Sequence, residues 1–259
     1  MNPNFSPTLL SRLEDAALNA SAPPQQRWID GWLVRYCPGK AKRARSIQAV
    51  ADGCLPLAER IAACDALFRE AGLPLIVRVT PFTRPAGLGA ELQCLGYHRK
   101  DDSRVMVCTE LPAVMPALPA GLQFQRLPHA EFAEVVGALR DTPADQRAAH
   151  AERLTQSPAP YQGWVLRQTG SGLVVACGQI ASEADMVGLY DVFTHPQHRG
   201  QKLAGLLCTA LLVRAREQGA RVAYLQVDAA NAPAITVYQR MGFVDAYGYH
   251  YLSPDPDAQ

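Results

Sequence analysis

The sequence lacks the features that mark a membrane protein, a secreted protein or a strongly charged binding protein. Lys and Arg number 25 against 24 Asp and Glu, so the net charge is +1, and this balance argues against a polybasic surface for nucleic acid or membrane. Apolar runs such as residues 173–177 fall far short of the roughly 20 residues that span a bilayer. Arg12, Glu14 and Asp15 interrupt the segment where a signal peptide has its apolar core. We therefore expect a cytoplasmic protein with neither a membrane nor a nucleic acid as partner.

Cysteines are present, but not in a pattern typical of a metal centre or a disulfide framework. The seven are Cys37, Cys54, Cys64, Cys94, Cys108, Cys177 and Cys208. No two are spaced as C-x-x-C, and their odd number leaves one thiol without a partner. We expect reduced, mostly buried thiols and no metal site.

The 259 residues are long enough for one large domain or two small ones. Pro112, Pro116 and Pro119 predict a linker over residues 111–121, which divides the chain into halves at 1–115 and 119–259. Helical and strand patterns alternate without either dominating, which predicts the α/β class with a mixed (α+β) sheet. In the second half we expect a strand over 188–194, a helix over 203–218, a strand over 222–228, a helix over 232–241 and a C-terminal strand pair.

The two halves share an internal echo. Residues 68–80 and 215–227 both read as a helix end, a glycine and a buried strand, and their glycines, Gly72 and Gly219, are 147 residues apart. Gly96 and Gly242, each between an apolar and an aromatic residue, are 146 apart. The echo favours a duplicated fold unit over chance, although helix–glycine–strand is a common sequence.

The strongest local pattern lies at residues 189–207, where a strand leads through a polar turn into an amphipathic helix. The start of a helix presents unpaired backbone N–H groups and a partial positive charge. Arg199, Gly200, Gln201 and Lys202 at such a start predict a cradle for a pyrophosphate. Taken alone, the pattern is equally consistent with an ordinary basic surface turn.

A second pattern follows about 30 residues later and decides between these readings. Asn231, Ala234, Tyr238, Gly242 and Phe243 match N-x-x-A-x-x-x-Y-x-x-x-G-F at every fixed position. With the loop at residues 197–202, which matches R/Q-x-x-G-x-G/A up to its last position, this stretch resembles the GNAT superfamily of acetyl-coenzyme A dependent N-acetyltransferases. The resemblance covers roughly residues 122–253 and implies the GNAT fold, in two tandem halves.

One residue departs from the family pattern. The family has glycine or alanine where this chain has Lys202. We expect the lysine to lie in the first turn of the helix, where no glycine conformation is needed, and to attract phosphate by its charge.

The resemblance implies which residues act and how. Acetyl-coenzyme A is the acyl donor, no metal takes part, and a primary amine of a small molecule or peptide attacks the thioester directly in a ternary complex. Tyr238 protonates the departing thiolate. The coenzyme is bound by Val192, Phe193, Thr194, Arg199, Gly200, Gln201, Lys202, Leu203, Ala204 and Asn231. The strand residues among them pair with the pantetheine arm and polarise the carbonyl.

Purely structural roles are also possible for these residues. Tyr238 could be a core aromatic, and Asn231 could simply cap the helix that follows it. His195 and His198 fit solvent-facing turn positions.

The base that deprotonates the amine stays open. At neutral pH the deprotonation costs about 4.6 kcal/mol for a lysine-like amine. The candidates are Tyr190, Asp191, Glu183 and Asp185, or a chain of water molecules. Because side chains alternate along a strand, we expect only one of Tyr190 and Asp191 to face the pocket.

The first half shows the scaffold without this chemistry. The positions equivalent to Arg199, Ala204 and Tyr238 hold Asp52, Leu57 (preceded by Pro56) and Leu92, which predicts a degenerate GNAT-like half that helps to wall the acceptor pocket. This half also contains a basic cluster, Arg35, Lys40, Lys42, Arg43 and Arg45, which we expect to be a solvated loop. The alternatives are a non-catalytic acyl-coenzyme A sensor and a nucleic-acid-binding module that uses the basic cluster. No pattern predicts an oligomeric state.

Overall fold

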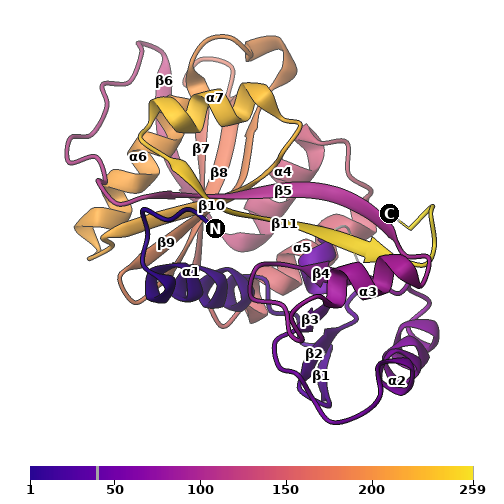
Figure 1. Cartoon of the computed structure of the whole chain (residues 1–259). Helices are drawn as coiled ribbons and strands as arrows, with labels where there is room; N and C mark the ends of the chain where they lie inside the picture. Colours follow the sequence, from indigo (N-terminus) through magenta and orange to yellow (C-terminus); the bar gives the residue numbers. More distant parts are fainter. Residues whose placement is uncertain (39–40, 259) are drawn as a thin grey trace.

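The computed structural model describes residues 1–38 and 41–258. Within them the strands form one 11-stranded sheet in the order β1-β2-β3-β4-β11-β5-β10-β9-β8-β7-β6 (Figure 1). The first half contains α1 (Pro7–Ala20), β1 (Gln26–Ile29), β2 (Trp32–Arg35), η1 (Lys42–Ala44), β3 (Ile47–Ala49), α2 (Leu57–Glu70), β4 (Val77–Val79), α3 (Leu88–Cys94) and β5 (His98–Cys108). The second half contains β6 (Leu122–Leu127), α4 (His129–Leu139), α5 (Ala144–Gln156), β7 (Tyr161–Gln168), β8 (Val174–Glu183), β9 (Met186–Thr194), η2 (Pro196–His198), α6 (Leu203–Glu217), β10 (Val222–Asp228), α7 (Ala232–Arg240) and β11 (Val244–Ser253).

Local chemistry explains where the helices begin and end. Ser6 caps α1 by accepting a hydrogen bond from the Leu9 N–H at 3.2 Å, and Pro7 occupies the first helical position, where its missing N–H costs nothing. Gly72 and Gly219 follow the ends of α2 and α6 with φ of +66° and +103°, the left-handed conformation that ends a helix. The glycine stops of the internal echo are therefore the same structural device.

The centre of the sheet is built from both halves. β5 lies between β10 and β11, and β11 lies between β5 and β4. In the β5–β11 pair, Val244 lies opposite Val107 at one end and Ser253 lies opposite His98 at the other. The expected C-terminal strand pair is therefore wrong: one strand, β11, follows α7, and its two neighbours come from the first half. Residues 109–121, between β5 and β6, contain neither helix nor strand.

Helices cover both faces of this mixed sheet. α6 and α7 pack on one face around Leu207, Leu211 and Phe243. α1 packs on the opposite face together with α4, and α5 contacts α4 (Figure 1). α2 and α3 enclose a separate core with β2, β3, β4 and the end of β11, in which Trp32 and Phe68 are fully buried. The mixed α/β architecture expected from the sequence is confirmed.

The basic cluster of the first half is not a solvated loop. Arg35 is 2% exposed. Arg43 donates from Nη1 to Gln226 Oε1 at 2.9 Å and to the Tyr249 hydroxyl at 3.1 Å, and Lys42 forms an ion pair with Asp101. The remaining lysine of the cluster, Lys40, lies outside the described residues. Arg43 therefore links the first half to the second, while Lys42 pairs with a residue of its own half.

All seven cysteines are free thiols, and Cys64, Cys108, Cys177 and Cys208 are buried. Within residues 1–38 and 41–258 no helix has the length and apolar character to cross a bilayer. In the same residues no three His, Cys, Asp or Glu side chains gather as a potential metal site.

Candidate active site

Two parallel strands at the centre of the second half separate towards their carboxyl ends. β9 and β10 pair from Met186 opposite Val222 to Leu189 opposite Leu225. Beyond this point the last residues of β10 pair with β5, and β9 continues beside β8 alone. In the described chain, residues 190–194 of β9 therefore leave one edge of their backbone free. A free strand edge presents N–H and C=O groups to an added extended chain.

A bulge near the start of this free edge changes which side chains face which way. Gln179 lies opposite Tyr190 and Cys177 lies opposite Phe193, so Asp191 and Val192 together face a single residue of β8. Asp191 takes up the extra length with φ +49°. Such a bulge breaks the alternation of side chains along the strand.

The bulge overturns one expectation. The Asp191 carboxylate accepts a hydrogen bond from Gln179 Nε2 at 2.6 Å, and Gln179 is the cross-strand neighbour of Tyr190. Tyr190 and Asp191 therefore lie on the same face of the sheet. The premise that they point to opposite faces is wrong, because it assumed a regular strand. Of the two, Asp191 lines the cavity described below and Tyr190 does not, so the prediction that one of them faces the pocket is confirmed.

The loop after β9 is an open cradle of backbone donors. The N–H groups of residues 200–205 donate to no acceptor in the described part of the chain. Gly200 has φ +78°, and a Cβ added there would meet no atom within 4 Å, so glycine is needed for its backbone conformation. Arg199 and Lys202 are exposed beside these donors. Six consecutive free donors, two cations and the amino end of α6 suit a polyvalent anion.

Lys202 does not lie in the first turn of α6, as expected from the sequence. It is the N-cap residue, with φ +60° and ψ +14°, and its side chain makes no capping hydrogen bond. It therefore adopts the left-handed conformation for which the family pattern has a small residue. Lysine pays a steric penalty in this conformation that glycine does not.

Tyr238 and Asn231 lie where the second pattern predicts them, on α7. Asn231 caps this helix by accepting a hydrogen bond from the Ala234 N–H at 3.2 Å. Tyr238 is 9% exposed, and its hydroxyl makes no hydrogen bond with a described residue. Burial, reinforced by the nearby Cys208 thiol, raises the pKa of Tyr238 well above its usual range, and the charge of Arg140 opposes this rise. The hydroxyl therefore stays protonated at neutral pH and is free to donate a hydrogen bond.

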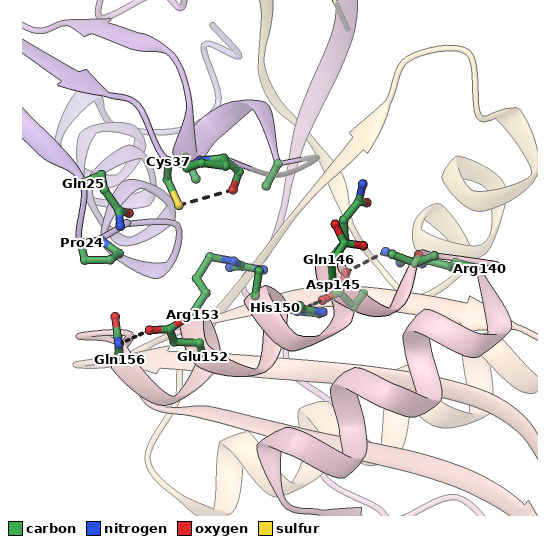
Figure 2. A pocket seen from close by; sticks show the side chains of 16 residues that line it. Pro24, Gln25, Cys37, Arg140, Asp145, Gln146, His150, Glu152, Arg153 and Gln156 are labelled. Atoms are coloured by element: carbon green, nitrogen blue, oxygen red, sulfur yellow. Dashed lines mark hydrogen bonds and ion pairs between the residues drawn. The ribbon is translucent and has the colours of Figure 1, made fainter. Parts of the chain in front are cut away.

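A cavity of about 550 Å³ opens beside Asp191. α5 forms one wall, and the first half forms the other through residues around Gln25 and Cys37. Figure 2 shows His150 and Arg153 on the α5 side and Pro24, Gln25 and Cys37 across from them. The volume is in the range of sites for small molecules. The complete lining is Pro24, Gln25, Cys37, Pro38, Ala41, Ala44, Arg140, Thr142, Asp145, Gln146, Ala149, His150, Glu152, Arg153, Gln156 and Asp191.

Asp191 is the most strongly held carboxylate of this cavity. Arg140 Nη1 donates to its Oδ1 at 2.9 Å, and His150 Nε2 lies 3.3 Å from its Oδ2. Burial alone would raise the pKa of Asp191, but the nearby His150 and the charge of Arg140 outweigh it and lower the pKa far below the usual range. Asp191 is thus an anion at any physiological pH.

The other candidate bases are less well placed. Tyr190 shares a hydrogen bond with the Tyr224 hydroxyl at 2.9 Å, and burial raises its pKa well above normal. Glu183 accepts a hydrogen bond from Asn19 Nδ2 at 2.8 Å, and Asp185 forms an ion pair with Arg12. Both contacts are with α1, at the β8–β9 turn, so neither carboxylate lines the cavity.

Sequence reasoning missed His150 and Arg140. Neither belongs to a recognisable pattern, and both lie far from Asp191 along the chain, on α5 and at the end of α4. Only the packing of these helices brings them to the bulge of β9.

The first half contains a loop equivalent to the open cradle, but that loop is filled. Gly53, at the position of Gly200, has φ +73°. The N–H groups of Cys54 and Leu55 donate to the Asp30 carboxylate at 2.9 Å, and Arg60 Nε lies 2.8 Å from Asp30 Oδ2. A carboxylate of the chain itself thus takes the place that an external anion would need.

Comparison with known proteins identifies the family. Residues 10–252 match the family described as "Probable histone acetyltransferase Rv0428c C-terminal". The chain is 21% identical over 234 residues to the "Uncharacterized N-acetyltransferase YobR" of Bacillus subtilis (strain 168), covering 87% of this chain and 91% of that protein.

Solved structures agree in fold. A GCN5-related N-acetyltransferase from Kribbella flavida superposes with a TM-score of 0.65 at 19% identity, over 96% of both chains. A tandem GNAT protein from the clavulanic acid biosynthesis pathway gives a TM-score of 0.60 at 20% identity, over 77% of this chain and 70% of that one.

Proposed function

Because the chain belongs to the Rv0428c C-terminal acetyltransferase family, and so to the GNAT N-acetyltransferases, we propose that it transfers an acetyl group from acetyl-coenzyme A to a primary amine. The amine attacks directly while both substrates are bound. The observation that carries the proposal is the set of six unpaired N–H groups at residues 200–205, which lie at the end of a strand with a free edge. The two features together match a ligand with a diphosphate at one end and an extended amide-bearing arm at the other.

The residues present fit this coenzyme. The loop residues Arg199, Gly200, Gln201, Lys202, Leu203 and Ala204 would hold the pyrophosphate through backbone donors and two cations. The free edge at Val192, Phe193 and Thr194 would pair with the pantetheine arm as an added strand. The Asn231 side-chain oxygen is used in capping α7, which leaves its amide N–H groups to bind the coenzyme.

When bound, acetyl-coenzyme A supplies a thioester with an activated acetyl carbon. The N–H groups at the free edge would polarise its carbonyl, the role of an oxyanion hole. The Tyr238 hydroxyl, protonated and without a partner in the described chain, would donate to the departing sulfur. Because burial raises the Tyr238 pKa above that of a thiol, the hydroxyl would give its proton to the departing sulfur as it regains one from the amine nitrogen, late in the step.

The cavity beside Asp191 is the site we propose for the acceptor. It adjoins the free edge of β9, and its volume of about 550 Å³ suits a small molecule or the end of a peptide. Residues of the first half line it, which gives that half a function without a coenzyme site of its own. We propose that residues 1–115 and 119–259 are tandem GNAT-like halves, with acetyl transfer confined to the second.

The experiment that tests the function is thiol release from acetyl-coenzyme A with pooled primary amines, alongside calorimetry with the coenzyme alone. Tyr238→Phe should lower kcat by about 100-fold or more while the coenzyme Kd stays the same. Tyr97→Phe, on the α3 side of the first half, is the matched control and should behave as wild type.

The outcomes separate the proposals. Unchanged turnover in Tyr238→Phe would remove the tyrosine from the mechanism. Coenzyme binding without thiol release across the panel would favour the alternative of an acyl-coenzyme A sensor. Calorimetry that detects no heat at saturating coenzyme would end the case for this site.

A further inference from the structure

One histidine lies beside the Asp191 carboxylate at the cavity, although no sequence pattern marks it. His150 projects from α5 into the cavity (Figure 2), and its side chain is 17% exposed. Its Nε2 lies 3.3 Å from Asp191 Oδ2. The contact is close enough for an ion pair but lacks the geometry of a hydrogen bond. An imidazole whose Nε2–H lies next to a carboxylate has the lone pair of Nδ1 on its other side.

The carboxylate partner is itself held in place from two directions. Arg140 Nη1 donates to Asp191 Oδ1 at 2.9 Å, and Gln179 Nε2 donates to Oδ2 at 2.6 Å. The bulge at Asp191 fixes its backbone, and the next residues, from Val192 onwards, form the free edge. The His150 ring is therefore oriented by the same bulge that begins the proposed coenzyme strand.

We propose that His150 is the general base of the acetyl transfer and that Asp191 is its positioning residue. The assignment rests on the proposed function and deepens it. An ammonium acceptor loses one proton to His150 Nδ1, which passes it to solvent. The free amine then forms the C–N bond as the C–S bond breaks. The second proton lost by the nitrogen replaces the one that Tyr238 gives to sulfur, so the products are an amide, a thiol and one proton in solvent.

The charged groups around the cavity favour His150 over Asp191 as the base. Charged or titratable groups reach this corner from every wall of the cavity: Asp191 on β9, Arg140 after α4, Asp145, Glu152 and Arg153 on α5, and Cys37 from the first half. The arginines and the His150 contact lower the pKa of Asp191, so its carboxylate is too weak a base to accept a proton at neutral pH. It can accept a hydrogen bond and hold the imidazole tautomer, which is the part an aspartate plays in a histidine dyad.

The test compares His150→Gln and Asp191→Asn with wild type, and His98→Gln, an exposed histidine on β5, is the matched control. Initial rates are measured against pH with two acceptors from the thiol-release panel. One is an alkyl amine of pKa about 10.4, and the other is an amine that is already neutral at pH 7. Calorimetry with coenzyme A and thermal denaturation report on folding and on the coenzyme site.

With the alkyl amine, His150→Gln should lower kcat/KM at pH 7 by about 100-fold or more, and the loss should shrink as rising pH supplies free amine. With the neutral amine the same variant should stay close to wild type. Asp191→Asn should change the pH profile in the same direction with a smaller loss. His98→Gln should leave rates and profile unchanged.

A profile and rate for His150→Gln equal to wild type, with the coenzyme Kd unchanged, would overturn the assignment and leave the acetyltransferase proposal standing. Wild-type protein that binds coenzyme but turns over no amine would overturn both. If His150→Gln does not fold, a second substitution at the same position tests the general base. His150→Asn is then compared with wild type on the two amines; a loss confined to the alkyl amine supports the base, and rates equal to wild type overturn it.

Discussion

Lys202 offers a test in which stability and binding should move in opposite directions. A side chain with φ +60° carries a steric cost of about 1–2 kcal/mol relative to the ordinary helical region. Glycine removes that cost but loses about 0.5–1 kcal/mol through the greater freedom of its unfolded chain. The lysine charge also lies at the positive end of α6, which costs about 0.3–1 kcal/mol. In the absence of ligand, Lys202→Gly should therefore be about 1 kcal/mol more stable than wild type.

Lys202→Ala separates the two causes. Alanine keeps the backbone cost and removes the charge, so its stability should lie between those of wild type and Lys202→Gly. For a chain of this size about 1 kcal/mol corresponds to about 2–4 °C in Tm, which thermal denaturation without ligand resolves. Coenzyme affinity should follow the charge alone, with a loss of about two- to five-fold in both variants, because an exposed charge contributes at most about 1 kcal/mol.

Calorimetry at low and high salt completes the measurement. The difference in coenzyme Kd between wild type and the two variants should shrink as salt screens the lysine. Lys202→Gly less stable than Lys202→Ala would refute the left-handed backbone. Equal coenzyme affinities in all three proteins at low salt would refute the role of the charge. Lys202 would then destabilise the fold without strengthening coenzyme binding.

Two further predictions address the buried Glu14–Arg78 ion pair and the cavity. Glu14→Gln should lower the free energy of unfolding at neutral pH by about 3–5 kcal/mol in chemical denaturation, because it leaves Arg78 buried without the carboxylate that binds it; a change no larger than that of the exposed Glu59→Gln would refute this. Burial raises the pKa of Glu14 but Arg78 and Tyr247 outweigh it and lower the pKa, so the wild-type advantage should be full above about pH 4.5 and shrink as pH falls through the lower folded value. Ala149→Phe, at an exposed position of α5 that lines the cavity, should raise the amine KM by about 10-fold and leave the KM for acetyl-coenzyme A unchanged; equal changes in both would place the acceptor elsewhere.

What the sequence predicts well in this protein is what short-range chemistry determines. The helix over residues 203–218 is α6, and the strand over 222–228 is β10, with bounds of Leu203–Glu217 and Val222–Asp228. The Asn231 cap and the Gly219 stop depend on neighbours within a few residues. Their signals are therefore complete within a short window of sequence.

The features that sequence reasoning missed depend on which strands and helices become neighbours. The sequence around Val244 does not indicate that β11 pairs with β5 rather than with a second C-terminal strand. Long-range strand pairing depends on residues throughout the sheet. The bulge at Asp191 is likewise a property of the β8–β9 pair. The bulge turns Asp191 towards α5, where it meets His150. No spacing along the chain could predict this contact.

The loops at Gly53 and Gly200 differ in what their N–H groups contact. Gly53 and Gly200 share almost the same φ, +73° and +78°, and each precedes a helix, α2 or α6. In the first half, Asp30 accepts from the Cys54 and Leu55 N–H groups, and backbone hydrogen bonds are the main cause that lowers the pKa of its carboxyl. Donors satisfied within the fold have nothing left to offer a ligand. The unpaired donors around Gly200 meet only solvent in the described chain, and a loop with this geometry gains most from an anion that arrives from outside.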